Sequence, residues 1–381
     1  MTHWSLECSS CGSTAPGDEL AHVCPQCGQP YLVRYARLPP AREALADRWD
    51  MWRYAAWLPV APDESPVTLG EGATPIMQAP ALAESLGVRT LWIKEEGLNP
   101  TGSFKARGMS AAVTRAKALG VPGFVVPTAG NAGAALAAYG AAANIPVRVF
   151  APVETPAAIL ATIRAFGAQL VTVEGHIGDA GKAARAFAAE HGWFDVSTLR
   201  EPYRIEGKKT MGLELAEQLG WRFPDAIIYP TGGGTGLIGM WKAFQELVRA
   251  GWIEKEATLP RMISAQASGC APIVRAFHAG EDRATPWANP QTHAAGLRVP
   301  GPLGDRLILR ALRESHGDAE AAEEGEIRRA TDELARRTGI DASPEGGCAL
   351  AVCRRLIASG RLAHDAEVLM FNTGSGASYR A

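Results

Sequence analysis

The chain lacks a surplus of charge of either sign: 38 Lys and Arg residues stand against 40 Asp and Glu residues, for a formal net charge of −2. Proteins that bind nucleic acid through its phosphates carry a basic excess, so we expect no nucleic-acid partner. Aromatic residues make up only 7%, whereas 47% hydrophobic and 20% charged residues are ordinary for a globular protein. A chain of 381 residues exceeds one hydrophobic core, which predicts two lobes and an appendage.

Long runs of large apolar residues are also missing. The charge-free stretch 129–147 consists mostly of Ala and Gly and contains Asn131, Asn144 and Pro146, so it predicts a loop, a tightly packed helix and a turn. The first residues show no charged start followed by an apolar run, and we expect no signal peptide. These features favour a cytoplasmic protein without a membrane partner.

Cysteines are few, and four of them are clustered in two Cys-x-x-Cys pairs separated by twelve residues. This spacing is typical of a closed tetrahedral Zn²⁺ site with no open position for catalysis. Paired redox thiols are the alternative, but no thioredoxin-like pattern lies nearby. A zinc ribbon can also bind nucleic acid or protein, yet no Lys or Arg occurs within the cluster, so a structural role is favoured. The four expected ligands are Cys8, Cys11, Cys24 and Cys27.

The other three cysteines, Cys270, Cys348 and Cys353, have apolar or Gly-rich neighbours and are expected to be buried free thiols. Between the cluster and the body, the segment 41–66 carries Trp49, Trp52 and Trp57, which we expect to pack the appendage onto the body.

After Leu69, short apolar runs alternate with helical segments, which predicts βαβ units and a mainly parallel sheet with ligands at the carboxyl ends of the strands. The expected strands are 90–95, 123–127, 147–152, 169–174, 226–230, 262–267 and 367–372. The expected helices are 103–118, 131–143, 155–166, 237–249, 325–338 and 344–359.

Three segments share a turn that joins a strand to a helix. In the first, 99–105, Pro100 and Gly102 make the turn, and Ser103 is predicted to cap a helix with Lys105 in its first turn. The helix dipole and partial burial disfavour a charged amine there, which suits carbonyl chemistry. An exposed lysine at a helix start is the reading that this motif alone favours.

The second segment, 127–132, offers the backbone N–H groups of Ala129 and Gly130 and the Thr128 hydroxyl to a carboxylate. Asn131 could bond a ring hydroxyl, although an ordinary Asn-capped helix is the simpler reading. The third segment, 230–237, is a glycine cluster followed by a helix, which predicts a phosphate cradle, with a flexible glycine turn between strand and helix as the alternative. It matches neither a nucleoside triphosphate loop nor a dinucleotide-binding motif. Its cradle residues are Gly232, Gly233, Gly234, Thr235 and Gly236.

Together the three segments describe a ligand with an aldehyde, a ring hydroxyl and a phosphate. The order Ser-Phe-Lys, Gly-Asn, glycine loop and terminal Thr-Gly-Ser-Gly spans 103–376 and resembles the fold type II pyridoxal-phosphate (PLP) enzymes. Within these, the stretch 201–210 is similar to the Asn-Pro-x-Arg-x-Glu-Gly-x-Lys-Thr segment of the threonine synthase family, some members of which have a cysteine-rich N-terminus.

The resemblance implies a Schiff base between PLP and Lys105, with Phe104 beside it. It further implies that Asn131 contacts the phenolic oxygen of the cofactor, that the glycine loop holds its phosphate, and that Thr373 meets the pyridine nitrogen. The implied reaction converts O-phosphohomoserine and water to threonine and phosphate, and a phosphorylated substrate requires a second anion site. The candidates for substrate binding are Ser103, Thr128, Ala129, Gly130, Arg107, Arg204 and Lys208, the last three being solvated helix-start residues in the simpler reading.

Three positions depart from the family pattern. Ala106 replaces an Asp, Glu201 stands where Asn is usual, and the segment 173–177 contains His176 in place of a small or aromatic residue. A serine/threonine dehydratase, another PLP β-elimination or β-replacement enzyme such as a cysteate-synthase-like one, and a non-catalytic zinc-ribbon regulator are therefore alternatives.

The expected architecture is an α/β, two-lobed, three-layer αβα fold of fold type II with a small N-terminal zinc ribbon on the larger lobe and PLP in the cleft. The domains would be 1–37 (zinc ribbon), 38–102 with 201–381 (large PLP-binding lobe) and 103–200 (small mobile lobe). A small amino-acid substrate and a homodimer are implied by the resemblance.

Overall fold

The computed structural model describes residues 3–380, which form two compact units. Unit 1 comprises residues 3–73, 99–210 and 378–380, and unit 2 comprises residues 74–98 and 211–377. Residues 38–73 and 99–210 belong to the same unit. The domains predicted from the sequence instead combine 38–102 with 201–381 in one lobe. The cysteine-rich segment likewise belongs to unit 1 rather than to the unit that contains most of 201–381.

Unit 1 begins with a three-stranded antiparallel sheet, ordered β2-β1-β3, that carries the cysteine cluster. Alternate residues of this sheet, among them Leu6 and Val33, are fully buried in one hydrophobic cluster with Met109 and Val113 of helix α2, so the sheet and α2 share a core. The strands are β1 (Trp4–Cys8), β2 (Thr14–Pro16) and β3 (Tyr31–Tyr35), and α2 spans Lys105–Ala118.

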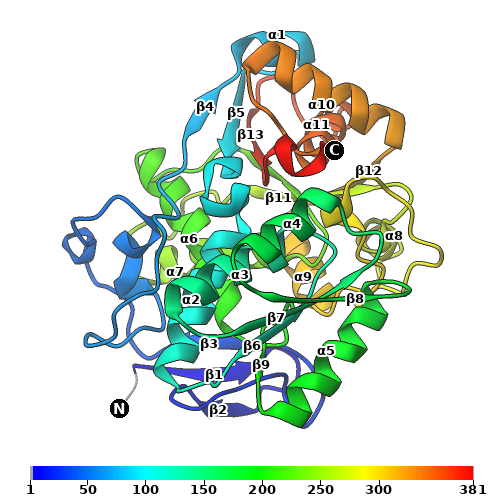
Figure 1. Ribbon diagram of the computed structural model, residues 1–381. Coiled ribbons are helices and arrows are strands. Elements are labelled where there is room, and N and C mark those ends of the chain that lie inside the picture. The colour runs from blue at the N-terminus through cyan, green and yellow to red at the C-terminus, as the bar shows by residue number, and fades with distance from the viewer. Residues whose placement is uncertain (1–2, 381) are drawn as a thin grey trace. The chain divides into compact units, whose positions relative to one another are not determined.

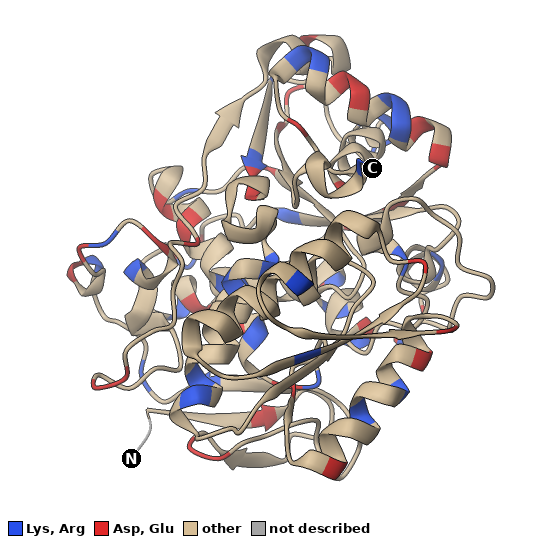
Figure 2. Ribbon diagram, viewed as in Figure 1, with Lys and Arg blue, Asp and Glu red and all other residues tan. Residues whose placement is uncertain are grey.

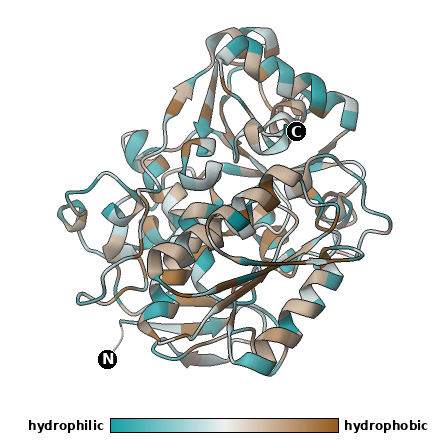
Figure 3. Ribbon diagram, viewed as in Figure 1, coloured by the Kyte–Doolittle hydropathy of each residue, from teal (hydrophilic) through white to brown (hydrophobic). Residues whose placement is uncertain are grey.

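The rest of unit 1 is a parallel four-stranded sheet, ordered β8-β7-β6-β9, with helices on both faces (Figure 1). Val126 and Val149 pack towards α2, α3 and α4, whereas Val125 and Phe150 pack against α5, because successive strand residues point to opposite faces. Figure 3 shows β6 and β7 largely in brown, as expected for strands buried on both sides. The elements are β6 (Phe124–Pro127), α3 (Asn131–Ala143), β7 (Val147–Pro152), α4 (Ala157–Ala165), β8 (Gln169–Val173), α5 (Ile177–His191) and β9 (Phe194–Asp195).

Unit 2 contains a six-stranded sheet, ordered β12-β11-β10-β13-β5-β4, in which only the short edge strand β4 runs antiparallel. Ile228 and Ile263 face a cluster with α1, α10 and α11, and Ile227 and Met262 are buried on the opposite face. The strands are β4 (Ile76–Gln78), β5 (Thr90–Glu95), β10 (Ala226–Pro230), β11 (Arg261–Ala267), β12 (Asp318–Ala322) and β13 (Glu367–Asn372).

The helices of unit 2 are amphipathic where they border the surface, and Figure 2 shows blue and red residues interspersed along α10. These helices are α1 (Pro80–Leu86), α7 (Thr235–Arg249), α8 (Pro272–His278), α9 (Asp305–Glu314), α10 (Glu324–Thr338) and α11 (Pro344–Ala358). The chain passes from unit 1 to unit 2 within helix α6 (Tyr203–Gln218). The three-layer αβα arrangement expected from the sequence is confirmed in each unit.

Several smaller expectations are settled as well. Cys270, Cys348 and Cys353 are free and completely buried, as predicted. In the connector, Trp52 and Trp57 are buried, but Trp49 is 83% exposed, so its predicted packing role is wrong. No helix within residues 3–380 is long and apolar enough to cross a membrane.

Candidate active site

Lys105 is the first residue of α2 and follows a tight, strained turn. Thr101 has φ +62° and Gly102 has φ +68°, and the left-handed conformation is rare for a β-branched residue such as threonine. Strain of this kind concentrates at functional sites. The turn directs the chain into α2 so that Lys105 lies half-buried at the helix start.

The helix cap differs from the prediction. Phe104, not Ser103, is the N-cap residue of α2, and no side chain caps this helix end. The Ser103 hydroxyl is instead completely buried, and no hydrogen-bond partner for it lies among the described residues. A buried hydroxyl of this kind next to a half-buried lysine fits a site that receives a polar ligand.

A second lysine contacts the same aromatic ring as Lys105. Lys105 Nζ lies 3.8 Å from the centroid of the Phe104 ring, and Lys208 Nζ lies 4.4 Å from the same centroid. Lys208 also donates a hydrogen bond to the Phe104 carbonyl and is itself fully buried. Helix α6, which carries Lys208, therefore holds the residue that precedes Lys105.

The start of α3 is organised by Thr128. Its hydroxyl accepts hydrogen bonds from the N–H groups of Gly130 and Gly133, both at 3.1 Å, and donates to the Gly130 carbonyl at 2.7 Å. Gly130 is the N-cap residue, so Asn131 is the first helical residue and does not cap the helix. Asn131 and Ala129 are partly exposed, and a Cβ on Gly130 would meet nothing within 4 Å, which leaves space beside this helix terminus.

In unit 2, the glycine loop 232–236 leads from β10 into α7, and Gly234 is the N-cap residue with φ +76°. A Cβ on Gly232 would lie 2.2 Å from the Gly296 carbonyl oxygen, and one on Gly236 would lie 2.0 Å from the Tyr229 hydroxyl. The neighbouring residues therefore exclude any larger side chain. The first-turn N–H groups of a fifteen-residue helix have no intrahelical acceptors, which is the donor arrangement that binds a phosphate.

Thr373 follows β13 directly and is 5% exposed. The predicted cofactor residues thus occur in both units: Lys105 and Asn131 in unit 1, and the glycine loop and Thr373 in unit 2. The chemistry of this donor set, an amine, an amide, hydroxyls and a glycine-lined helix start, fits PLP.

The three basic candidates for a second anion site are not solvated helix-start residues, because all are buried. The Arg107 guanidinium donates to the Thr210 hydroxyl at 3.2 Å, and the Arg204 guanidinium donates to the Val196 carbonyl at 2.7 Å. Burial lowers the pKa of Arg204, an effect that the nearby Glu201 and Asp195 carboxylates oppose.

The departures from the family pattern have local structural explanations. Glu201 accepts hydrogen bonds from the N–H groups of Tyr203 (2.7 Å) and Arg204 (3.1 Å), so it caps α6; burial raises its pKa to about 7. His176 forms a capping box with Asp179 at the start of α5. Ala106 is fully buried in the core shared with the N-terminal sheet.

The four clustered cysteines have the geometry of a metal site. Their sulfur atoms all lie within 4.8 Å of one another, and the Cys8–Cys27 pair is 3.4 Å and the Cys11–Cys24 pair 3.6 Å apart. A tetrahedral zinc ion with Zn–S bonds of about 2.3 Å requires sulfurs about 3.8 Å apart. The glycines after Cys11 and Cys27 adopt φ +73° and +70°, as the predicted knuckle turns require.

A family model described as "Pyridoxal-phosphate dependent enzyme" matches residues 67–374. The chain belongs to this family of PLP-dependent enzymes. Solved structures with the same fold include maize serine racemase (TM-score 0.69, 23% identity, covering 80% of this chain and 88% of that one). Another is a threonine deaminase from T.th., with TM-score 0.64 and 27% identity over 79% of this chain and 92% of that one. The fold is therefore that of fold type II.

Within the PLP-dependent enzymes, the chain belongs with the threonine synthases. It is 36% identical to the threonine synthase of Methanosarcina acetivorans over 97% of this chain and 91% of that one. It is 35% identical to that of Methanocaldococcus jannaschii over the same shares. The threonine synthase of Mycobacterium leprae is 36% identical over 85% of this chain and 86% of its own length.

Proposed function

We propose that the chain converts O-phosphohomoserine and water to threonine and phosphate, as a PLP-dependent carbon–oxygen lyase. The observation that carries this proposal is the similarity to threonine synthases along nearly the whole chain, which includes the cysteine-rich segment as well as the catalytic motifs. Racemases and deaminases of the same fold share less sequence with this chain.

Lys105 is the proposed catalytic residue. When bound, PLP supplies an aldehyde that an amine can attack and a ring system that accepts electrons from the substrate. The amine of Lys105 would attach the cofactor and then move the proton at the α-carbon of the substrate. Asn131 would donate to the phenolic oxygen, the glycine loop would bind the phosphate, and the Thr373 hydroxyl would meet the pyridine nitrogen.

The substrate would be held by the remaining polar groups of the same motifs. The helix start at 128–130 would offer backbone N–H groups to the substrate carboxylate, and the unpartnered Ser103 hydroxyl belongs to a residue two positions before Lys105. Arg107, Arg204 and Lys208 stay candidates for the substrate phosphate. Each is buried and hydrogen-bonded within unit 1, so direct binding would require it to exchange a protein acceptor for the phosphate.

The four-cysteine cluster is proposed to bind one structural zinc ion, which its sulfur geometry supports. The functional division into a large PLP-binding lobe (38–102 and 201–381) and a small mobile lobe (103–200), the homodimer and the cytoplasmic location remain predictions from the sequence.

The first experiment is a turnover assay on purified, PLP-loaded protein that follows phosphate and threonine from O-phosphohomoserine. Equal amounts of both products are expected from the wild type. Lys105→Ala should lose about six orders of magnitude, as removal of a nucleophile that acts throughout a reaction does. Reduction with sodium borohydride should attach PLP irreversibly to Lys105 of the wild type, seen as an increase in protein mass, and should leave the mass of the variant unchanged.

A PLP-loaded wild type that releases neither product would overturn the proposed reaction while leaving the cofactor assignment intact. Ammonia or a keto acid from serine or threonine would then identify a dehydratase. A chain that takes up no PLP would instead support a non-catalytic role.

A further inference from the structure

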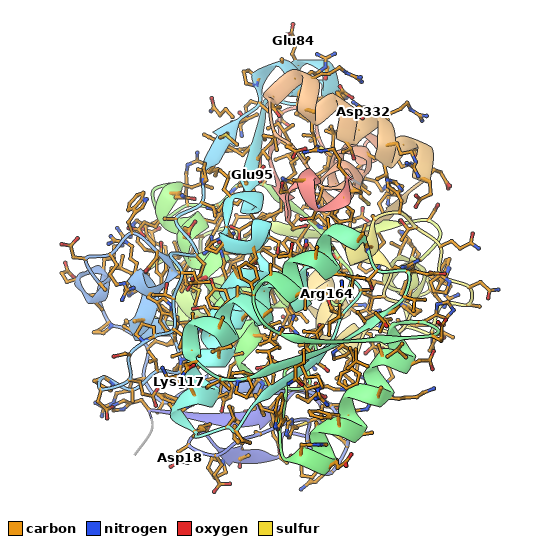
Figure 4. All side chains as sticks on the ribbon, in the orientation of Figure 1. Asp18, Glu84, Glu95, Lys117, Arg164 and Asp332 are labelled. Carbon is orange, nitrogen blue, oxygen red and sulfur yellow. The ribbon has the colours of Figure 1, made fainter. Side chains whose placement is uncertain are left out.

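The neighbouring strands β5 and β13 end in a buried pair of polar residues, Glu95 and Asn372, which stand opposite each other in the sheet register. The Asn372 amide nitrogen donates to both carboxylate oxygens of Glu95, at 2.9 Å each. The N–H group of Gly97 donates to the same carboxylate at 2.7 Å. Glu95 is 5% exposed and Asn372 is completely buried, and Figure 4 labels Glu95 where β5 ends.

The orientation of the Asn372 amide is fixed from both sides. Its oxygen accepts from the N–H group of Ser343 at 3.2 Å, while its nitrogen faces Glu95, so a flipped amide would oppose donor to donor and acceptor to acceptor. The backbone after Asn372 is held as well, because the Ser343 N–H group also donates to the Gly374 carbonyl at 3.0 Å. On the side of β5, Gly97 packs closely against the residues after Asn372, because a Cβ on Gly97 would lie 3.1 Å from the Gly374 carbonyl carbon.

We infer that Glu95 is a positioning residue that sets the place of Thr373 through the Asn372 amide. The inference rests on the proposed function insofar as Thr373 is the partner of the cofactor ring nitrogen. Glu95 itself contacts neither the substrate nor the cofactor in this role. Its carboxylate supplies the acceptors that hold the last residue of β13, and Thr373 is the next residue along the chain.

The charge of Glu95 changes near neutral pH. Burial raises its pKa to about 7; the hydrogen bonds from Asn372 and Gly97 oppose this shift, and the acidic Glu96 and Asp341 that face it add to it. A protonated carboxyl has one acceptor fewer for the Asn372 amide. Both hydrogen bonds from the Asn372 amide to the Glu95 carboxylate are therefore fully formed only above about pH 7.

The sign of the stability effect follows from the raised pKa. A carboxyl with a higher pKa in the folded protein favours folding most at low pH, below its unfolded value near 4.5, and this contribution is lost as the pH rises through about 7. The state that holds Asn372 best is thus the state in which Glu95 contributes least to stability.

The test compares wild type with Glu95→Gln, which imitates the neutral carboxyl in shape and charge. In the PLP-loaded wild type, the cofactor fluorescence and kcat should both change with an inflection near pH 7. Glu95→Gln should lack this inflection and should lose about ten- to a hundredfold in kcat at high pH with little change in KM, as a small misplacement of a positioned group does.

A second readout does not depend on catalysis. Amide hydrogen exchange in the segment 367–376 of the cofactor-free chain, corrected for intrinsic rates, should be faster in Glu95→Gln than in wild type at high pH and equal at low pH. Equal exchange at both pH values would overturn the inference, whatever the activity of the protein.

Glu246→Gln is the matched control, because Glu246 is a buried carboxylate of unit 2 that pairs with Lys242 at 2.6 Å on α7. It should lower stability and leave the pH profile of the cofactor unchanged. A wild type that makes threonine and a Glu95→Gln variant with the same pH profile would refute the inference and keep the proposed function. A wild type that makes no threonine, together with the expected difference in hydrogen exchange, would refute the proposed function and keep the inference about Glu95.

Discussion

At the scale of single residues, the glycine loop shows how close packing selects a residue type. Gly232 has no strained backbone, yet a methyl group there would meet the backbone oxygen of Gly296, which cannot move without displacing the chain. The sequence therefore marks the loop through glycine itself, but the reason for each glycine lies in a neighbour far along the chain.

Gly232→Ala is expected to lower the free energy of unfolding by about 1–3 kcal/mol, the usual penalty of overpacking, and to weaken PLP binding because the loop must shift. Urea unfolding and titration with PLP measure the two effects. Gly178→Ala in α5, where a Cβ would meet nothing within 4 Å, is the control and should change stability by less than about 1 kcal/mol. Unchanged PLP affinity in Gly232→Ala would argue against the cradle.

At the scale of elements, a buried ion pair within helix α6 is hydrogen-bonded to the N-terminal sheet. Glu206 and Lys209, both fully buried, lie 2.7 Å apart, and the Tyr35 hydroxyl of β3 donates to Glu206 at 2.6 Å. Lys209 also donates to the Trp57 carbonyl. A cysteine-rich segment that looks like an appendage in sequence is therefore joined to the helix that carries Lys208.

Glu206→Gln should lower the free energy of unfolding by about 3–5 kcal/mol, because Lys209 would remain buried without its counter-charge. The comparison is Glu7→Gln in β1, whose half-exposed pair with Arg34 should contribute less than about 1 kcal/mol. Denaturant unfolding of both variants is the measurement. Equal losses would mean that the buried pair is no more important than the surface pair.

At the scale of the whole molecule, the cysteine cluster lies in the core that Cys8 and Cys24 share with Met109 of α2. Metal binding at this cluster should therefore stabilise unit 1 and not only the first residues of the chain.

The purified protein is expected to contain one zinc ion per chain by elemental analysis. Cys11→Ser should lose the metal and unfold at lower denaturant concentration, whereas Cys353→Ala, which removes a buried thiol elsewhere, should keep it. A metal-free wild type whose intact mass indicates disulfides would establish the redox alternative instead.

The sequence by itself predicted the motifs and many of the helices and strands, because these depend on residues close together in the chain, but it did not predict helices α5, α6 and α9 or strand β12. Strands β5, β7, β10 and β13 and helix α3 have the predicted bounds, and the other predicted elements differ by one or two residues. The cofactor motifs and the cysteine pairs were equally visible, since a strand, a turn and the first turn of a helix form a local unit.

Only the tertiary structure decided the environment of each side chain. The burial of Arg204 and Lys208 and the exposure of Trp49 follow from packing between distant segments. The pair of Glu95 and Asn372 joins residues 277 positions apart, and the order of strands in a parallel sheet brings them together. No local pattern encodes that order, so this support for Thr373 could not be read from the sequence.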